Sequence, residues 1–205
     1  MMTLFLTSSF AETKDLLLTV LNKDKIGKDM LFITTAAQVE EYRHFIDQVY
    51  KGFEEIGLTV TAADIAEMSE KDAARKIETC SVLAVSGGNT FYLLQELKKK
   101  NLLSLICRRL SEGMLYAGES AGAIITAPDI SYAGIMDSSD LAPELTDTTA
   151  LALVDFSILP HFGEEPFVTA CQQTIEEYRD KVQLLPINNH QAVLVTEKGY
   201  RVLGE

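Results

Sequence analysis

Ser120 is the residue of this sequence best placed to act as a nucleophile. It lies in the segment Gly-Glu-Ser-Ala-Gly at 118–122, between the apolar run 114–117 and the apolar residues 123–125. Such a segment between a buried strand and a helix is typical of a sharp turn that exposes the serine oxygen at the edge of a sheet. The following helix would direct its unpaired N–H groups toward the same point. The alternative is a tight turn whose serine only caps the helix.

A serine hydroxyl needs a base within hydrogen-bonding distance before it can attack a carbonyl, and histidine is the usual base. The sequence contains three histidines. His161 follows the apolar run 157–160, so a parallel sheet would place it at the same edge as Ser120. His190 lies in a polar turn after another predicted strand and is the reserve candidate, whereas His44 falls on the polar side of a predicted helix. We therefore expect His161 to be the base, with a structural turn residue as the alternative.

A second motif, Ser-Gly-Gly-Asn-Thr at 86–90, follows the apolar run 82–85 and precedes a predicted helix. Paired glycines let a backbone approach a ligand closely and present an N–H to it. We predict that the N–H groups of Gly88 and Ala121 stabilise an oxyanion, and that Asn89 and Glu119 contact the substrate. The motif lacks the glycine spacing of phosphate-binding loops. A helix N-cap at Asn89 or Thr90 is compatible with either interpretation.

The chain as a whole indicates an α/β fold. Short apolar runs alternate with amphipathic stretches, which predicts one domain over residues 1–205, a three-layer sandwich with helices on both faces of a mostly parallel sheet. Apolar residues recur every three or four positions over 38–56, which predicts a helix there. Further helices are predicted at 11–21, 69–78, 90–109 with a break near Asn101, and 165–179. Strands are predicted at 3–7, 30–35, 58–61, 81–86, 114–117, 151–154, 157–159, 184–187, 192–196 and 200–203, with a long irregular loop or hairpin at 127–149.

The composition argues against several classes of function. The chain has 205 residues, and its 30 acidic and 18 basic residues give a net charge of −12, which would repel nucleic acids and anionic membranes. We expect no membrane span, because no stretch reaches the ~20 apolar residues that one needs, and no secretory signal, because the first residues lack a basic region. Cys80, Cys107 and Cys171 are odd in number and widely spaced, which favours free thiols in the cytoplasm over disulfides or a zinc site.

Three motifs together resemble the peptidase E and cyanophycinase family of serine peptidases. They are Gly-Gly-Asn-Thr-Phe-Tyr-Leu-Leu at 87–94, Gly-Glu-Ser-Ala-Gly-Ala at 118–123 and Pro-His-Phe at 160–162, and their order and approximate spacing follow the family pattern. The resemblance spans nearly the whole chain. It implies a flavodoxin-like sheet, similar to that of class I glutamine amidotransferases. It also implies Ser120 as nucleophile, His161 as base, and Gly88 and Ala121 as oxyanion donors.

The resemblance leaves the group that orients His161 open. Peptidase E takes an aspartate from the loop after the serine, and Asp137 has the best spacing for that role, with Asp129 and Asp140 as rivals. Cyanophycinase uses a glutamate near the position of Asn189, and an asparagine could orient an imidazole without carrying charge. In the alternative, Asp137 only caps a turn.

The expected substrate also departs from the family, whose known members cleave next to aspartyl residues. Aspartyl-specific relatives place an arginine soon after the His-Phe pair, where it binds the substrate carboxylate through two hydrogen bonds. Here Gly-Glu-Glu-Pro follows at 163–166, and the next arginine is Arg179. We expect Glu164 and Glu165 to repel an acidic side chain, so a neutral or basic residue at the cleavage site is at least as compatible with the sequence.

These observations predict a cytoplasmic serine peptidase for small peptides, monomeric or homodimeric. No metal or organic cofactor and no nucleic-acid or membrane partner is called for. The same residues could instead hydrolyse an ester or a non-peptide amide. A third possibility is a binding protein on the same fold that has lost turnover.

Overall fold

The computed structural model describes residues 2–24 and 26–204. Within them, seven strands form one sheet in the order β3-β2-β4-β5-β1-β8-β9. The strands from β3 to β1 in this order are parallel to one another. At the edge beyond β1, β8 pairs antiparallel with β1, and β9 pairs antiparallel with β8. The carboxyl ends of the parallel strands therefore meet at one edge of the sheet. The strand bounds are Thr3–Thr7 for β1, Asp29–Ile33 for β2, Thr59–Ala63 for β3, Val82–Val85 for β4, Leu115–Glu119 for β5, Ala192–Thr196 for β8 and Gly199–Leu203 for β9.

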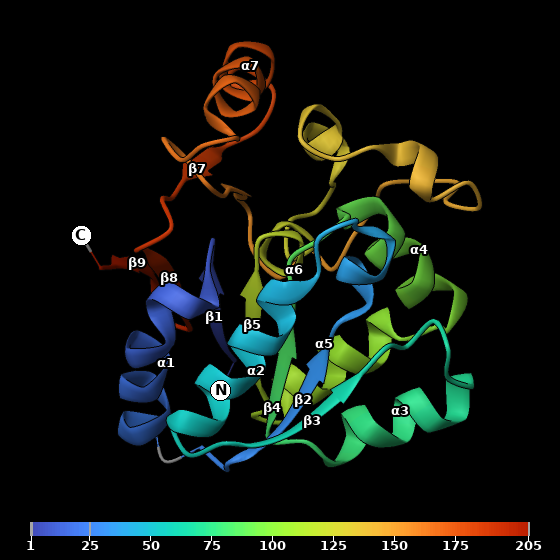
Figure 1. Ribbon diagram of the computed structural model, residues 1–205, viewed down its shortest axis with the longest axis vertical. Coiled ribbons are helices and arrows are strands. Elements are labelled where there is room, and N and C mark those ends of the chain that lie inside the picture. The colour runs from blue at the N-terminus through green and yellow to red at the C-terminus, as the bar shows by residue number, and fades with distance from the viewer. Residues whose placement is uncertain (1, 25, 205) are drawn as a thin grey trace.

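Helices cover both faces of this sheet, which confirms the predicted three layers (Figure 1). Successive side chains of a strand point to opposite faces, so Phe5 packs with one group of helices and Leu4 with the other. The first group is α1 (Phe10–Asp24) and α2 (His44–Glu55), and the second is α3 (Glu70–Thr79), α4 (Thr90–Lys99) and α5 (Leu103–Ser111). The break between α4 and α5 lies where it was predicted, at Asn101, which has a φ of +53°.

The remaining elements lie at and beyond the carboxyl ends of the parallel strands (Figure 1). The short helix α6 (Ala121–Ile124) follows β5 directly. A second sheet pairs β6 (Ser157–Leu159) with β7 (Leu184–Pro186), and α7 (Val168–Tyr178) connects them. The predicted irregular loop at 127–149 is present and contains two short 3-10 helices, η2 (Ser131–Ile135) and η3 (Ser139–Leu141).

Two predicted elements differ from the structure. The helix predicted at 38–56 starts only at His44, because the chain before it forms the 3-10 helix η1 (Thr35–Val39), whose Ala36 carbonyl accepts a hydrogen bond from the N–H of Asn89. The predicted strand at 151–154 was wrong. Its backbone N–H groups instead donate to carbonyl oxygens of residues 125–127, so this segment packs against the chain that follows α6.

Candidate active site

Ser120 lies in a strained turn between β5 and α6. Its backbone has φ +48° and ψ −108°, a conformation that residues with a side chain rarely adopt. A Cβ at Gly118 would lie 2.3 Å from the carbonyl oxygen of Gly122, and one at Gly122 would lie 2.4 Å from that of Val85. The two glycines therefore allow a close crossing of backbones that presents the Ser120 side chain at the edge of the sheet.

His161 faces Ser120 from the loop after β6. Its Nε2 lies 2.9 Å from Ser120 Oγ, although 41 positions separate the two residues in the chain. The expected proximity is therefore present. The other ring nitrogen, Nδ1, lies 2.8 Å from Oδ1 of Asn189. Because an amide oxygen only accepts hydrogen bonds, Nδ1 carries the proton and Nε2 can accept the hydroxyl proton of Ser120.

Several contacts fix the His161 ring in this orientation. The residue has a φ of +59°, and its backbone N–H donates to Oγ of Ser8 at 3.0 Å. Its ring stacks on Phe167 with 4.5 Å between the centroids. Burial lowers the pKa of His161 below its ordinary value, while the hydrogen bond to Asn189 acts in the opposite direction. The imidazole is therefore held neutral, the form in which it can accept a proton.

Asp137, predicted to orient His161, does not contact it. One carboxylate oxygen of Asp137 accepts a hydrogen bond from the N–H of Thr90 at 2.9 Å, and burial raises the pKa of Asp137 to about 6. The rival Asp129 accepts hydrogen bonds within its own loop. Asp140 lies on η3, and in the described part of the chain it makes no hydrogen bond to the ring of His161. Spacing along the chain misled this prediction because the loop folds onto the start of α4, so that Asn189 is the side chain beside Nδ1.

The two predicted oxyanion donors are available for a ligand. Among the described residues, the structure records no acceptor for the N–H of Gly88 or of Ala121. Ala121 is the first residue of α6, and the first N–H groups of a helix have no partner within it. Gly88 has φ +127° and packs so tightly that a Cβ would lie 2.2 Å from the carbonyl oxygen of Ala36. Only glycine fits there.

Asn89 and Glu119, predicted to contact substrate, line the cavity beside Ser120, but their polar atoms already bond to protein. Oδ1 of Asn89 accepts from the N–H of Tyr92, which caps α4, and its Nδ2 donates to the Ser138 carbonyl oxygen. The carboxylate of Glu119 accepts two backbone N–H groups, and burial raises its pKa to about 7. The N-cap at Asn89 was an alternative in the sequence analysis, whereas the two backbone contacts of Glu119 were not expected.

Ser120 and His161 open onto a cavity of about 530 Å³. Its described lining contains four carboxylate side chains and neither lysine nor arginine. The carboxylates are those of Glu40, Glu119, Asp137 and Glu165, and the apolar side chains of the lining are Tyr42, Phe45, Ile124, Met136, Leu141 and Phe167. The two other histidines, His44 and His190, do not belong to this lining and are exposed.

The described residues show no group of three or more His, Cys, Asp or Glu side chains arranged to hold a metal ion. All three cysteines are described and none forms a disulfide. Among the helices of residues 2–24 and 26–204, none has the length and apolar character needed to cross a membrane.

A serine and a neutral histidine in contact at the edge of a parallel sheet, with free backbone N–H groups at the same edge, define a serine hydrolase of the α/β class. The sequence model described as "Peptidase family S51" matches residues 4–203. The chain therefore belongs to peptidase family S51, and it is a serine-type peptidase.

Relatives in several bacteria support this membership. An uncharacterized peptidase of Pasteurella multocida is 43% identical over 195 residues, which cover 95% of this chain and 94% of that protein. An uncharacterized peptidase of Listeria monocytogenes is 43% identical over 198 residues, covering 97% of this chain and 96% of the relative. Peptidase E of a Nostoc species is 33% identical over 135 residues, covering 66% of this chain and 52% of that enzyme.

Solved structures show the same fold. The crystal structure of a candidate peptidase E protein from Listeria monocytogenes has a TM-score of 0.93 and 41% identity, covering 100% of this chain and 99% of the other. A peptidase from an acI-B1 Actinobacterium has a TM-score of 0.73 at 18% identity, covering 99% of this chain and 87% of the other. At that identity, the second likeness concerns the fold alone.

Proposed function

We propose that this chain hydrolyses small peptides through an acyl-enzyme formed on Ser120, which sits on a nucleophile elbow. The contact of 2.9 Å between Ser120 Oγ and His161 Nε2 carries this proposal. His161 takes the hydroxyl proton as Ser120 attacks the peptide carbonyl, and it then gives that proton to the departing amine. Water, activated by the same histidine, releases the acyl group.

Asn189 supports the reaction as an orienting residue without charge. By accepting a hydrogen bond from Nδ1, it keeps Nε2 unprotonated and directed at Ser120. A carboxylate in this place would also stabilise the imidazolium that forms during attack, which a neutral amide does more weakly. The N–H groups of Gly88 and Ala121 would stabilise the negative charge on the carbonyl oxygen, a contribution worth about 10²–10³ in rate per donor.

The charge of the cavity favours substrates with a positive charge over aspartyl peptides. Glu40 and Glu165 line the cavity together with the buried Glu119 and Asp137. The described lining contains no arginine or lysine that could bind an acidic side chain. A cavity of about 530 Å³ has the size of sites for small ligands. We therefore propose dipeptides or tripeptides with a lysine or arginine side chain near the cleaved bond as substrates.

Labelling with a fluorophosphonate, which reacts with activated serines, tests the nucleophile. We expect the wild-type protein to be labelled and Ser120→Ala to show none. A folded wild-type protein that resists labelling would instead favour a binding protein without turnover. Hydrolysis of a dipeptide set then tests the substrate: lysyl and arginyl members should exceed aspartyl ones, whereas turnover of simple esters alone would indicate ester chemistry.

The state of the cysteines supports a reducing compartment, for which we propose the cytoplasm. Cys80 and Cys171 are buried, and burial raises the pKa of the Cys80 thiol to about 11. Thiols held in this way are unreactive and form no disulfide. Fractionation of cells that produce the protein would test the assignment.

A further inference from the structure

The turn at residues 86–90 uses nearly all of its backbone N–H groups in hydrogen bonds with the surrounding protein. The N–H groups of Ser86 and Asn89 donate to the carbonyl oxygens of Ile33 and Ala36, each at 2.9 Å. Those of Gly87 and Thr90 donate to carboxylates instead, at 3.1 Å and 2.9 Å. Gly88, between them, is the one residue of the turn whose N–H has no acceptor recorded among the described residues. This N–H is one of the two predicted oxyanion donors.

Glu119 binds this turn on one side. The residue is only 5% exposed, and its Oε2 accepts from the N–H of Gly87. Its Oε1 accepts from the N–H of Phe10, the first residue of α1, at 2.8 Å. The positive end of the α1 dipole stabilises a carboxylate in that position. One side chain thus joins β5, the start of α1 and the Gly87 turn, immediately before Ser120.

Asp137 binds the same turn on the other side. Its Oδ2 accepts from the N–H of Thr90 at the start of α4. Asn89, next to Thr90, donates its side-chain N–H to the Ser138 carbonyl oxygen, so the loop at 137–138 holds two successive residues of the turn. The turn is therefore anchored at both ends by segments that surround Ser120.

Burial of these two carboxylates is costly, because an ionised group loses its hydration and no cation of residues 2–24 and 26–204 compensates it. This cost is visible in the pKa values, which burial raises to about 7 for Glu119 and about 6 for Asp137. Backbone N–H groups are the partners that the structure gives them. Apolar side chains would be less costly at these two positions. The carboxylates are explained if their hydrogen bonds fix the position of the Gly88 N–H.

We propose that Glu119 and Asp137 are positioning residues, which hold the two ends of the 87–90 turn so that the Gly88 N–H points at the reacting carbonyl oxygen. Neither carboxylate contacts the peptide in this arrangement. The inference rests on the proposed function, because it assumes that Ser120 attacks a carbonyl in this cavity.

The test measures how fast a neutral fluorophosphonate labels Ser120 as its concentration rises. This separates the maximal rate of bond formation from the concentration that gives half of that rate. In Glu119→Gln the shape is kept, but the amide has one accepting oxygen where the carboxylate uses two. Asp137→Leu keeps a side chain of similar size and removes the oxygen that accepts the Thr90 N–H. We expect the maximal rate to fall by about tenfold to hundredfold, because the phosphoryl oxygen loses a well-placed donor, while the half-maximal concentration stays within about twofold.

Asp129→Leu provides the matched control. Asp129 also accepts a backbone N–H, from Ser131, together with the Thr148 hydroxyl, but it lies outside the described lining of the cavity. The loss of this carboxylate should lower the melting temperature and leave the labelling rate unchanged. Glu119→Asp, which keeps the charge and is too short to reach both N–H groups, replaces Glu119→Gln if the glutamine variant does not fold.

The outcomes separate the two proposals. If the folded wild-type protein is not labelled at Ser120, the proposed function fails. If the wild type is labelled and Glu119→Gln and Asp137→Leu react at the same maximal rate, the positioning role is overturned. A change confined to the half-maximal concentration would assign these carboxylates to ligand contact and would equally overturn it.

Discussion

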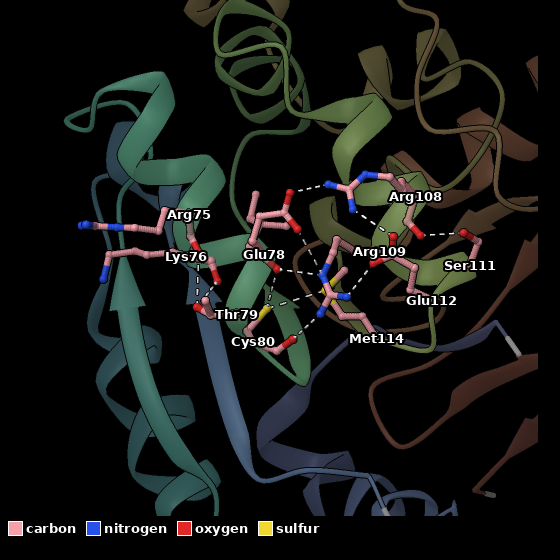
Figure 2. Close-up of polar contacts among 11 residues, drawn as sticks. Arg75, Lys76, Glu78, Thr79, Cys80, Arg108, Arg109, Ser111, Glu112 and Met114 are labelled. Carbon is pink, nitrogen blue, oxygen red and sulfur yellow. Dashed lines mark hydrogen bonds and ion pairs between the residues drawn. The ribbon is translucent and has the colours of Figure 1, made fainter.

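The two ends of the parallel strands carry polar clusters of opposite character. The amino-end cluster consists of Glu78 on α3, Arg108 and Arg109 on α5, and Glu112 directly after α5 (Figure 2). Glu112 pairs with Arg109 at 2.8 Å and with Arg108 at 2.9 Å, and Arg108 also pairs with Glu78. At the carboxyl ends, the carboxyl-end cluster contains Glu119, Ser120, Asp137, His161 and Asn189.

The difference lies in how charge is compensated. In the amino-end cluster, Arg109 and then Arg108 hold the pKa of Glu112 below its ordinary value, and water screens these exposed pairs. In the carboxyl-end cluster, burial raises the pKa of Glu119 and Asp137, and only backbone N–H groups bind them. Paired exposed charges stabilise a surface weakly, whereas buried carboxylates without a cation mark a place where geometry matters more than stability.

The largest expected effect comes from removing the base of the carboxyl-end cluster. His161→Ala should reduce turnover by about 10³-fold or more, because Ser120 then has no group to accept its proton. Folding should remain intact. His44→Ala is the control, since His44 is exposed at the start of α2 and does not line the cavity. Equal activity of the two variants in a peptide-hydrolysis assay would contradict the assignment.

A second comparison uses one glycine at each end of the sheet. Gly88 and Gly113 both have positive φ, at +127° and +102°, but a Cβ at Gly88 would lie 2.2 Å from the Ala36 oxygen, whereas nothing lies within 4 Å of one at Gly113. We expect Gly88→Ala to displace the oxyanion N–H and to reduce turnover by about 10²-fold. Gly113→Ala should cost about 1–2 kcal/mol of stability through backbone strain alone.

Thermal unfolding and turnover measured on both variants check this comparison. If Gly113→Ala lowered turnover as much as Gly88→Ala, the effect would belong to strain in general and the turn at 87–90 would lose its special role.

A third prediction concerns the charge beside His161. Asn189→Asp places a carboxylate next to Nδ1, which favours the imidazolium and raises the pKa of His161. Because the base must be neutral, the acid limb of the pH–rate profile should move to higher pH. Asn189→Ala removes the hydrogen bond that raises the pKa, so its limb should not move upward. Labelling rates from pH 4 to 9 measure both shifts, and identical limbs in the two variants would exclude the contact as a determinant.

Much of the fold and the central contact could be predicted from the sequence, because they depend on local patterns. The alternation of apolar runs with amphipathic segments determines the three layers, and the glycines at 118 and 122 indicate the turn that presents Ser120. His161 could be chosen because a parallel sheet places the residues after its strands at one edge.

The prediction failed where a side chain acts on a distant backbone. Asp137 has suitable spacing to both Ser120 and His161, yet its carboxylate bonds to the N–H of Thr90, a choice that depends on how the 127–149 loop folds. Glu119, for which a substrate contact stays a prediction, accepts two N–H groups that were not expected, from α1 and from the 86–90 turn. An acidic residue at the end of an otherwise apolar strand was the available signal of such a role.

The smallest expected effect separates the two clusters by the pH dependence of stability. Burial raises the pKa of Glu119 to about 7 in the folded protein, so the folded state holds a proton that the unfolded state releases near the ordinary carboxyl pKa of 4.5. The stability from this group is therefore present at low pH and is lost as the pH rises through about 7. Through one group, the free energy of unfolding changes by at most about 1.4 kcal/mol per pH unit.

Glu119→Gln should remove this share of the slope between pH 5 and 8, as measured by urea unfolding. Glu112→Gln is the counterpart in the amino-end cluster. Its pKa is lowered by Arg109 and Arg108, so it contributes stability above the ordinary carboxyl pKa that is lost only as the pH falls below it. The Glu112 variant should therefore match the wild type in slope from pH 5 to 8. If the free energy of unfolding of Glu119→Gln had the same pH dependence as that of the wild type, the Glu119 carboxyl group would be ionised over this whole pH range. Burial would then not distinguish the two ends of the sheet.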